Sequence, residues 1–107
     1  MSFYTINDLA AVDMAPGLGR RAVYLDKVML TFVDFEPGIG LPRHSHPHEQ
    51  ITLVLEGTVE FTLDDETRIL EAGQGVTVAS NVPHSARSLD GSARVLDAWH
   101  PVREDYK

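Results

Sequence analysis

The sequence predicts an all-β protein built as a sandwich or a barrel. Short runs rich in β-branched and aromatic residues recur along the chain. Turn residues separate these runs at close intervals, and helical periodicity is nearly absent after residue 19. Each half of the chain also carries a glycine-rich turn, a strand-like run and a loop that contains histidine. Together these observations favour two packed sheets or one closed sheet.

The chain of 107 residues is long enough for a single modest core, and no linker or repeat divides it. We expect residues 1–107 to form one domain, with a lead-in over 1–19, a β-barrel over 20–100 and a tail over 101–107. In the lead-in, Asn7 or Asp8 is suited to cap one helical turn over Leu9–Val12.

The expected strands share their enrichment in β-formers and end at Gly, Pro, Asp or Asn. The stretches Ile51–Leu55 and Thr58–Leu63 form a hairpin in this interpretation, because only Glu56-Gly57 separates them. The expected strands are Arg21–Leu25, Val28–Phe35, Ile51–Leu55, Thr58–Leu63, Thr67–Leu70, Val76–Ala79, His84–Leu89 and Ala93–Trp99.

Composition excludes several classes of function. The net charge of −7, without a basic patch, argues against a nucleic-acid partner. The absence of cysteine excludes disulfides, thiolate metal sites and a cysteine nucleophile, so any metal must be held by nitrogen and oxygen ligands. No signal peptide or transmembrane stretch is recognisable, so we expect a cytoplasmic protein with no membrane partner.

A histidine cluster is the strongest functional signal. His44 and His46 lie two positions apart, so their side chains share one face if the segment is extended. Neutral imidazoles on one face are suited to bind a divalent metal. Gln50 begins the next strand-like run and can return an oxygen to the same face, and His84 in a later loop can complete the site. His48 and Glu49 are the competing ligands; Glu49 has the opposite parity to Gln50 and is expected to face outward.

The spacing of Gly38, His44, His46, Gln50 and Gly57 resembles the first sequence motif of the cupin superfamily, with Gln50 in the usual place of a glutamate. The stretch from Gly73 to Ser88 resembles the second motif, in which Gly73 and His84 match. Ala79, Asn81 and Ser88 replace the usual proline, glycine and asparagine. This resemblance implies a small RmlC-like jelly-roll barrel, also called a double-stranded β-helix, with His44, His46, Gln50 and His84 around one metal ion.

A narrower resemblance covers more of the chain. The segments HSHPHEQ, VLEG and NVPH, followed by DAWHPVREDY, are similar to the KdgF family of small cupins. That family converts 4,5-unsaturated monouronates from pectin and alginate breakdown into linear ketonised sugars. The resemblance implies that Asp97, Trp99 and Arg103 form the catalytic set, with Trp99 in place of the family's usual phenylalanine.

The residues themselves support these roles and leave alternatives. Asp97 can shuttle a proton near a bound sugar acid, or it can make only a structural hydrogen bond to a loop or to Arg103. Arg103 can pair with a substrate carboxylate, or with Glu104 or Asp105 at the surface. Trp99 can face a sugar ring or pack in the core.

Other polar residues are interpreted as structural. Arg20 and Arg21 are expected to lie in solvent at the entrance of the first strand. Tyr106 lines the pocket only if the tail folds back over the barrel mouth. His100 is expected to point outward because its parity is opposite to that of Asp97.

Three histidines and an amide oxygen suit Zn, Ni, Co, Mn or Fe. A neutral amide in place of a carboxylate favours a metal that acts as a Lewis acid over oxygen chemistry. Two other functions stay open: another metal-dependent cupin enzyme, such as a dioxygenase or a sugar isomerase, and a non-catalytic binding protein. We expect a homodimer, because a small barrel gains buried area by pairing.

Overall fold

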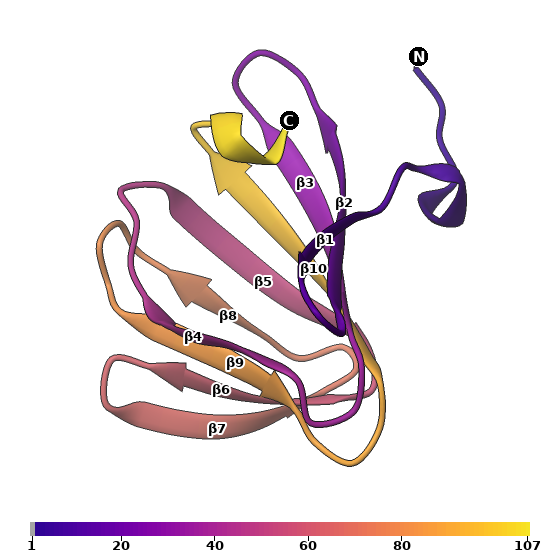
Figure 1. The fold of residues 1–107 in the computed structure, drawn as a ribbon. Coiled ribbons are helices and arrows are strands. Elements are labelled where there is room, and N and C mark those ends of the chain that lie inside the picture. Colours follow the sequence, from indigo (N-terminus) through magenta and orange to yellow (C-terminus); the bar gives the residue numbers. More distant parts are fainter. Residues whose placement is uncertain (1) are drawn as a thin grey trace.

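The computed structural model describes residues 2–107 and confirms the predicted all-β class. Two antiparallel sheets face each other and enclose a common interior, as expected for a jelly-roll barrel (Figure 1). In spatial order, the larger sheet contains β1 (Val12–Ala15), β2 (Leu18–Tyr24), β3 (Met29–Phe35), β10 (Ala93–His100), β5 (Glu49–Glu56) and β8 (Gly75–Val78). The smaller sheet contains β4 (Gly40–His44), β9 (His84–Ser88), β6 (Thr58–Leu63) and β7 (Glu66–Glu71). Two short 3-10 turns, η1 (Ile6–Asp8) and η2 (Glu104–Tyr106), flank the strands.

Strand alternation separates the interior from the outside. Along β5 and β10, buried and more exposed residues alternate one by one, as the pleat of a strand requires. Strand β10 pairs with β3 on one side and β5 on the other. Its inward-facing residues therefore occupy the centre of the larger sheet.

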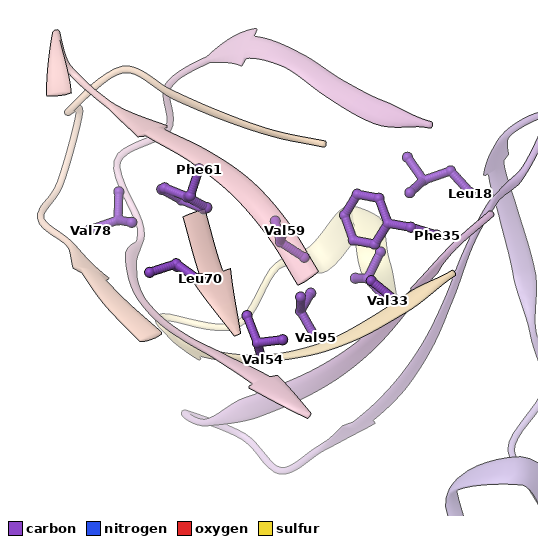
Figure 2. Packing of buried hydrophobic residues seen from close by; sticks show 10 residues of the cluster. Leu18, Val33, Phe35, Val54, Val59, Phe61, Leu70, Val78 and Val95 are labelled. Atoms are coloured by element: carbon purple, nitrogen blue, oxygen red, sulfur yellow. The ribbon is translucent and has the colours of Figure 1, made fainter. Parts of the chain in front are cut away.

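The apolar core fills one part of the interior. Side chains from both sheets point toward one another there, and Figure 2 shows Phe35 and Val33 from the larger sheet opposite Val59 and Phe61 from the smaller one. Their close packing removes apolar area from water and so stabilises the fold. The buried members are Leu18, Val33, Phe35, Val54, Val59, Phe61, Leu70, Val78, Ala93 and Val95.

The predicted helical turn over Leu9–Val12 is wrong. The only turn of helix before the strands of residues 2–107 is η1, at Ile6–Asp8, and Val12 already begins β1. An isolated turn has little stability of its own, so pairing with the sheet overrides a weak capping signal.

The predicted hairpin of Ile51–Leu55 with Thr58–Leu63 is wrong. Strands β5 and β6 follow each other in the sequence but lie in different sheets, where β5 pairs with β10 and β8, and β6 pairs with β7 and β9.

The sequence did not predict the hairpin between β1 and β2. Pro16-Gly17 ends any helix, but the same pair forms a tight turn, in which Gly17 adopts a φ of +79°. Ala15 then pairs with Leu18 across the turn. The lead-in expected over residues 1–19 therefore contains β1 and the start of β2.

Strand β4 lies in a region where the sequence indicated no separate strand. Pro42 interrupts the β-forming pattern, but β4 is the edge strand of its sheet, where the missing N–H is tolerated. Gly40 lets β4 approach β9 closely, because a Cβ atom there would lie 2.6 Å from the Ala86 carbonyl oxygen. The pairing places His44 directly opposite His84.

No helical segment within residues 2–107 has the length and apolar character needed to cross a bilayer.

Candidate metal centre

Three histidines converge inside the barrel. His44 ends β4, His46 lies two residues further on, and His84 begins β9. The ring centroid of His84 lies 4.3 Å from that of His44 and 4.8 Å from that of His46. One potential ligand atom from each ring falls within 4.8 Å of the others. The structure thus brings together the three histidines that the sequence predicted as ligands.

Backbone carbonyls fix the tautomer of all three rings. The Nδ1 atoms of His44, His46 and His84 lie 2.7, 3.1 and 2.9 Å from the carbonyl oxygens of Pro42, His48 and Val82. A carbonyl oxygen can only accept, so each Nδ1 carries the proton and each Nε2 keeps a free lone pair. Metal-binding histidines in proteins are oriented in this way by outer hydrogen bonds. The Nε2 atom of His84 is buried and has no hydrogen-bond partner among residues 2–107.

Gln50 faces the same point through its oxygen. Its Nε2 atom donates to the Thr52 hydroxyl at 2.8 Å and to Oδ1 of Asp97 at 3.3 Å, which fixes the orientation of the amide. The Oε1 atom then lies 3.0 Å from Nε2 of His46. With the proton of His46 on Nδ1, two lone pairs face each other across this contact. A cation held by these two residues would relieve this contact between lone pairs.

Burial keeps two of the rings neutral. Desolvation lowers the pKa of His84 from 6.5 to about 4, with smaller contributions from the neighbouring charges of His44, His46 and Arg103. Desolvation is also the largest cause that lowers the pKa of His46. Both rings therefore present lone pairs rather than protons at neutral pH, which is the form that binds a metal. The donor set of three imidazoles and one amide oxygen fits a divalent metal ion.

Asp97 lies in a polar layer next to these ligands. Its neighbours across the sheet are Thr31 on β3 and Thr52 on β5. The Thr52 hydroxyl donates to Oδ1 of Asp97 at 2.5 Å. Burial raises the pKa of the Asp97 carboxyl from 3.8 to about 6, although the hydrogen bonds from Thr52 and Gln50 and the charge of Arg103 oppose that rise. Such a carboxyl can accept and return a proton near neutral pH.

Trp99 and Arg103 lie beside the histidines. The Trp99 indole donates to the Thr31 hydroxyl at 2.9 Å, and its ring meets that of His46 edge to face at 5.0 Å. The guanidinium of Arg103 lies 4.9 Å from the centre of the Trp99 ring. Its Nε and Nη2 atoms donate to the carboxylate of Asp105, at 3.2 and 3.0 Å, so the pairing with Asp105 that the sequence left open is present. Its Nη1 atom is buried and has no hydrogen-bond partner in the described part of the chain.

The competing ligands lie elsewhere. His48 is not among the three converging histidines; its backbone carbonyl holds the ring of His46. Glu49 and His100 are exposed and lie opposite each other on the outer face of the larger sheet. The carboxylate nearest to the ligands is therefore Asp97, which reaches them through Gln50.

Sequence reasoning missed Thr52 and interpreted Tyr106 and Arg20 as structural. Thr52 shares the parity of Gln50 on β5, and this i, i+2 relation is the signal that could have identified it. Tyr106 lines the cavity because the tail does fold back over the barrel mouth. Arg20 lies against this tail.

The cavity around the histidines is small. It has a volume of about 30 Å³, which is room for about one water molecule. Its lining includes His44, His84, Gln50, Asp97 and Tyr106. A larger groove of about 860 Å³ runs along the outer face of the larger sheet and is mostly apolar. None of the three converging histidines lines that groove, so we assign the chemistry to the smaller cavity.

Comparison with known proteins identifies the fold family. Residues 31–99 match the model of the cupin domain. The structure superposes on an RmlC-like cupin from Shewanella frigidimarina with a TM-score of 0.94, at 26% identity over 100% of this chain and 96% of that one. It superposes equally well on KdgF from Halomonas sp., with a TM-score of 0.94 and 29% identity over 100% of this chain and 99% of that one.

Curated relatives have varied activities. The dimethylsulfoniopropionate lyase DddQ of Ruegeria pomeroyi is 30% identical over 77% of this chain and 42% of its own length. The protein named polyketide synthase CurC of Streptomyces cyaneus is 37% identical over 62% of this chain and 44% of its own length. The chain thus spans less than half the length of these curated relatives. Its matched domain, its two-sheet barrel and its inward-facing histidines show that it belongs to the cupin family and resembles KdgF.

Proposed function

We propose that this protein is a metal-dependent enzyme that converts 4,5-unsaturated monouronates into linear ketonised sugars. One observation carries the proposal: the buried carboxyl of Asp97 contacts Gln50, which in turn contacts His46. Arg103 lies over Trp99, which is next to His46. The likeness to KdgF over the whole chain supports the substrate class.

The substrate's own chemistry defines what the residues must do. The conversion is an isomerisation, in which the sugar ring opens to an enol and the enol becomes a ketone. A proton leaves an oxygen of the substrate, and a proton arrives on the carbon at position 4, so no atom is gained or lost. Asp97 has a pKa of about 6 and can take up the first proton and deliver the second.

Arg103 and Trp99 place the substrate. The buried Nη1 atom of Arg103 has no partner in residues 2–107 and can donate to the uronate carboxylate. Trp99 is buried under Arg103 and Tyr106, so its ring supports the guanidinium of Arg103 beside the cavity instead of stacking on the sugar. A divalent ion held by His44, His46, His84 and Gln50 would supply Lewis acidity toward the substrate's oxygens.

The test follows the ultraviolet absorption of freshly prepared 4,5-unsaturated galacturonate. We expect the protein to accelerate the loss of this absorption, and we expect a chelator to abolish the acceleration. Asp97→Asn should still bind metal but should no longer accelerate this loss of absorption. Asp65→Asn is the control, because Asp65 lies in an exposed turn, and it should accelerate the loss like the wild type. Unchanged turnover in Asp97→Asn would refute the proton-transfer role. No acceleration by the metal-loaded protein would refute this substrate and favour another cupin reaction or a binding role.

A further inference from the structure

Two adjacent arginines on β2 point in opposite directions. Arg21 faces outward and donates to Asp34 and to the carbonyl of Leu9. Arg20 pairs across the sheet with Val33, a member of the apolar core, so it lies on the interior face of β2. The expectation that both arginines lie in solvent is therefore wrong: Arg20 faces the interior, and the ion-paired side chain of Arg21 is only 20% exposed. A charged side chain on this face needs an explanation.

Arg20 has no acidic partner among the described residues. Of the seven arginines in the sequence, the other six each form an ion pair with Asp or Glu. This is unusual in a chain with 16 acidic and 9 basic residues. The guanidinium of Arg20 contacts the C-terminal turn instead. It lies 4.5 Å from the centre of the Tyr106 ring, and its Nη2 donates to the Asp105 carbonyl oxygen at 3.2 Å.

The C-terminal turn, residues 103–107, carries two groups to the cavity. Arg103 lies over the rings of both Trp99 and Tyr106, at 4.9 and 4.2 Å. Tyr106 meets Trp99 edge to face at 5.8 Å and lines the cavity. Tyr106 therefore contacts two guanidinium groups, one from the turn and one from the barrel wall.

Few hydrogen bonds attach the turn to the barrel, although Arg103 and Tyr106 pack on Trp99 and Lys107 Nζ lies 5.1 Å from the centre of the Tyr24 ring. The turn's internal hydrogen bonds join residues 103–107 to one another. Within the described chain, the hydrogen bond from Arg20 is the one that joins this turn to a neighbouring strand. The short 3-10 helix η2 contains no buried residue. Position of the turn therefore depends on a few contacts, and Arg20 supplies two of them.

We propose that Arg20 is a positioning residue: it anchors the C-terminal turn over the barrel mouth and so sets the positions of Arg103 and Tyr106 above the histidines. The inference rests on the proposed function for its role in catalysis, but not for the anchoring itself. The planar guanidinium of Arg20 can stack on Tyr106 and donate to a backbone carbonyl at the same time. The ammonium group of a lysine makes these two contacts less well.

Trp99 reports on this anchoring without any substrate. It is the only tryptophan in the sequence, it is buried, and both Arg103 and Tyr106 cover its ring. Acrylamide quenching of its fluorescence measures how open the turn is. We expect Arg20→Ala to raise the quenching constant at least twofold, with Arg20→Lys in between. Tyr106→Leu, which removes the ring between the two guanidinium groups, should raise it as well.

Arg87→Ala is the matched control, because Arg87 forms an exposed ion pair with Glu60 on the smaller sheet. Its acrylamide quenching constant should equal that of the wild type. Thermal unfolding identifies variants that are folded; if Arg20→Ala does not fold, Arg20→Lys and Tyr106→Leu carry the test. Wild-type quenching in the folded Arg20 and Tyr106 variants would overturn the proposal.

Kinetics on the unsaturated uronate give the second measurement. Loss of anchoring should raise KM about tenfold for Arg20→Ala with a much smaller change in kcat, because Arg103 would be placed less well for the carboxylate. A fall in kcat at constant KM would contradict the positioning role. A wild-type protein that is inactive on this substrate would refute the proposed function, and the quenching result would still decide whether Arg20 anchors the turn.

Discussion

The two ends of the barrel interior are built by the same strands but contain different side chains. Toward one end, β10 contributes Val95, which lies opposite Val33 and Val54. Two residues further along, the same strand contributes Asp97 to a polar layer. A step of two residues along β10 therefore takes the interior from apolar side chains to a layer of threonine hydroxyls and a carboxyl.

The contrast shows how a small barrel combines a stable core with a polar site. The apolar end stabilises the fold by removing apolar area from water. The polar end buries a carboxyl whose pKa is raised and two histidines whose pKa values are lowered. Each such shift means that the folded protein disfavours the charged form of that group. We therefore expect substitutions at the two ends to act on different properties.

The largest expected effect is at the apolar end. Phe35→Ala removes a buried aromatic ring from the core, and we expect the free energy of unfolding to fall by about 3–5 kcal/mol. The chelated wild type and variant should be compared by urea denaturation. Metal stoichiometry of the folded variant should stay at the wild-type value. A loss of metal binding in folded Phe35→Ala would show that the two ends are not separable.

At the polar end, Asp97→Asn should act in the opposite direction on stability. It should lower the rate of uronate conversion by about 10²–10⁴-fold, as expected for a lost proton-transfer group. The raised pKa means that ionisation of Asp97 destabilises the folded protein at pH 7.5. Asp97→Asn removes this ionisable group, so it should stabilise the metal-free protein at pH 7.5 by up to about 3 kcal/mol. A variant that is inactive and also destabilised would indicate a structural role for Asp97.

The pH dependence of stability should separate Asp97 from His84. Between about pH 4 and 6 the folded protein keeps a proton on Asp97 that the unfolded chain releases, so this group makes stability fall as pH rises. His84 has a lowered pKa, so between about pH 4 and 6.5 the unfolded chain binds the extra proton and stability rises with pH.

These two contributions oppose each other in the wild type, and Asp97→Asn leaves only the rising one. Urea midpoints of the chelated proteins at pH 4.5, 5.5 and 6.5 should therefore increase more steeply in Asp97→Asn than in the wild type. Parallel curves for the two proteins would contradict the raised pKa of Asp97.

The smallest expected effect concerns Thr52. Thr52→Val removes the hydroxyl that donates to Asp97 and accepts from Gln50. The pKa of Asp97 should rise further, so the pH profile of activity should move to higher pH and activity should fall about tenfold. Thr31→Val is the matched control, since Thr31 bonds Trp99 rather than the carboxyl. Equal pH profiles for Thr52→Val and the wild type would exclude this role of Thr52.

Much of the polar end could be predicted because its residues follow local rules. The i, i+2 spacing of His44 and His46, and the shared parity of Asp97 and Trp99, place side chains on one face of a strand. Residue patterns alone could not place Arg20 or Tyr106. Their positions depend on how the C-terminal turn folds back over β2, which is a contact between distant parts of the chain. Strand β1 could not be predicted for the same reason, because its strand conformation depends on its pairing with β2.

Cobalt(II) titration tests the central claim, which is that His44, His46, His84 and Gln50 form a metal centre at the polar end. The wild type should bind one Co²⁺ per chain with new visible absorption bands. His84→Ala should lose those bands, and His100→Ala, on the exposed outer face, should keep them. Full cobalt binding by His84→Ala, or no cobalt binding by the wild type, would contradict a metal centre at these four residues.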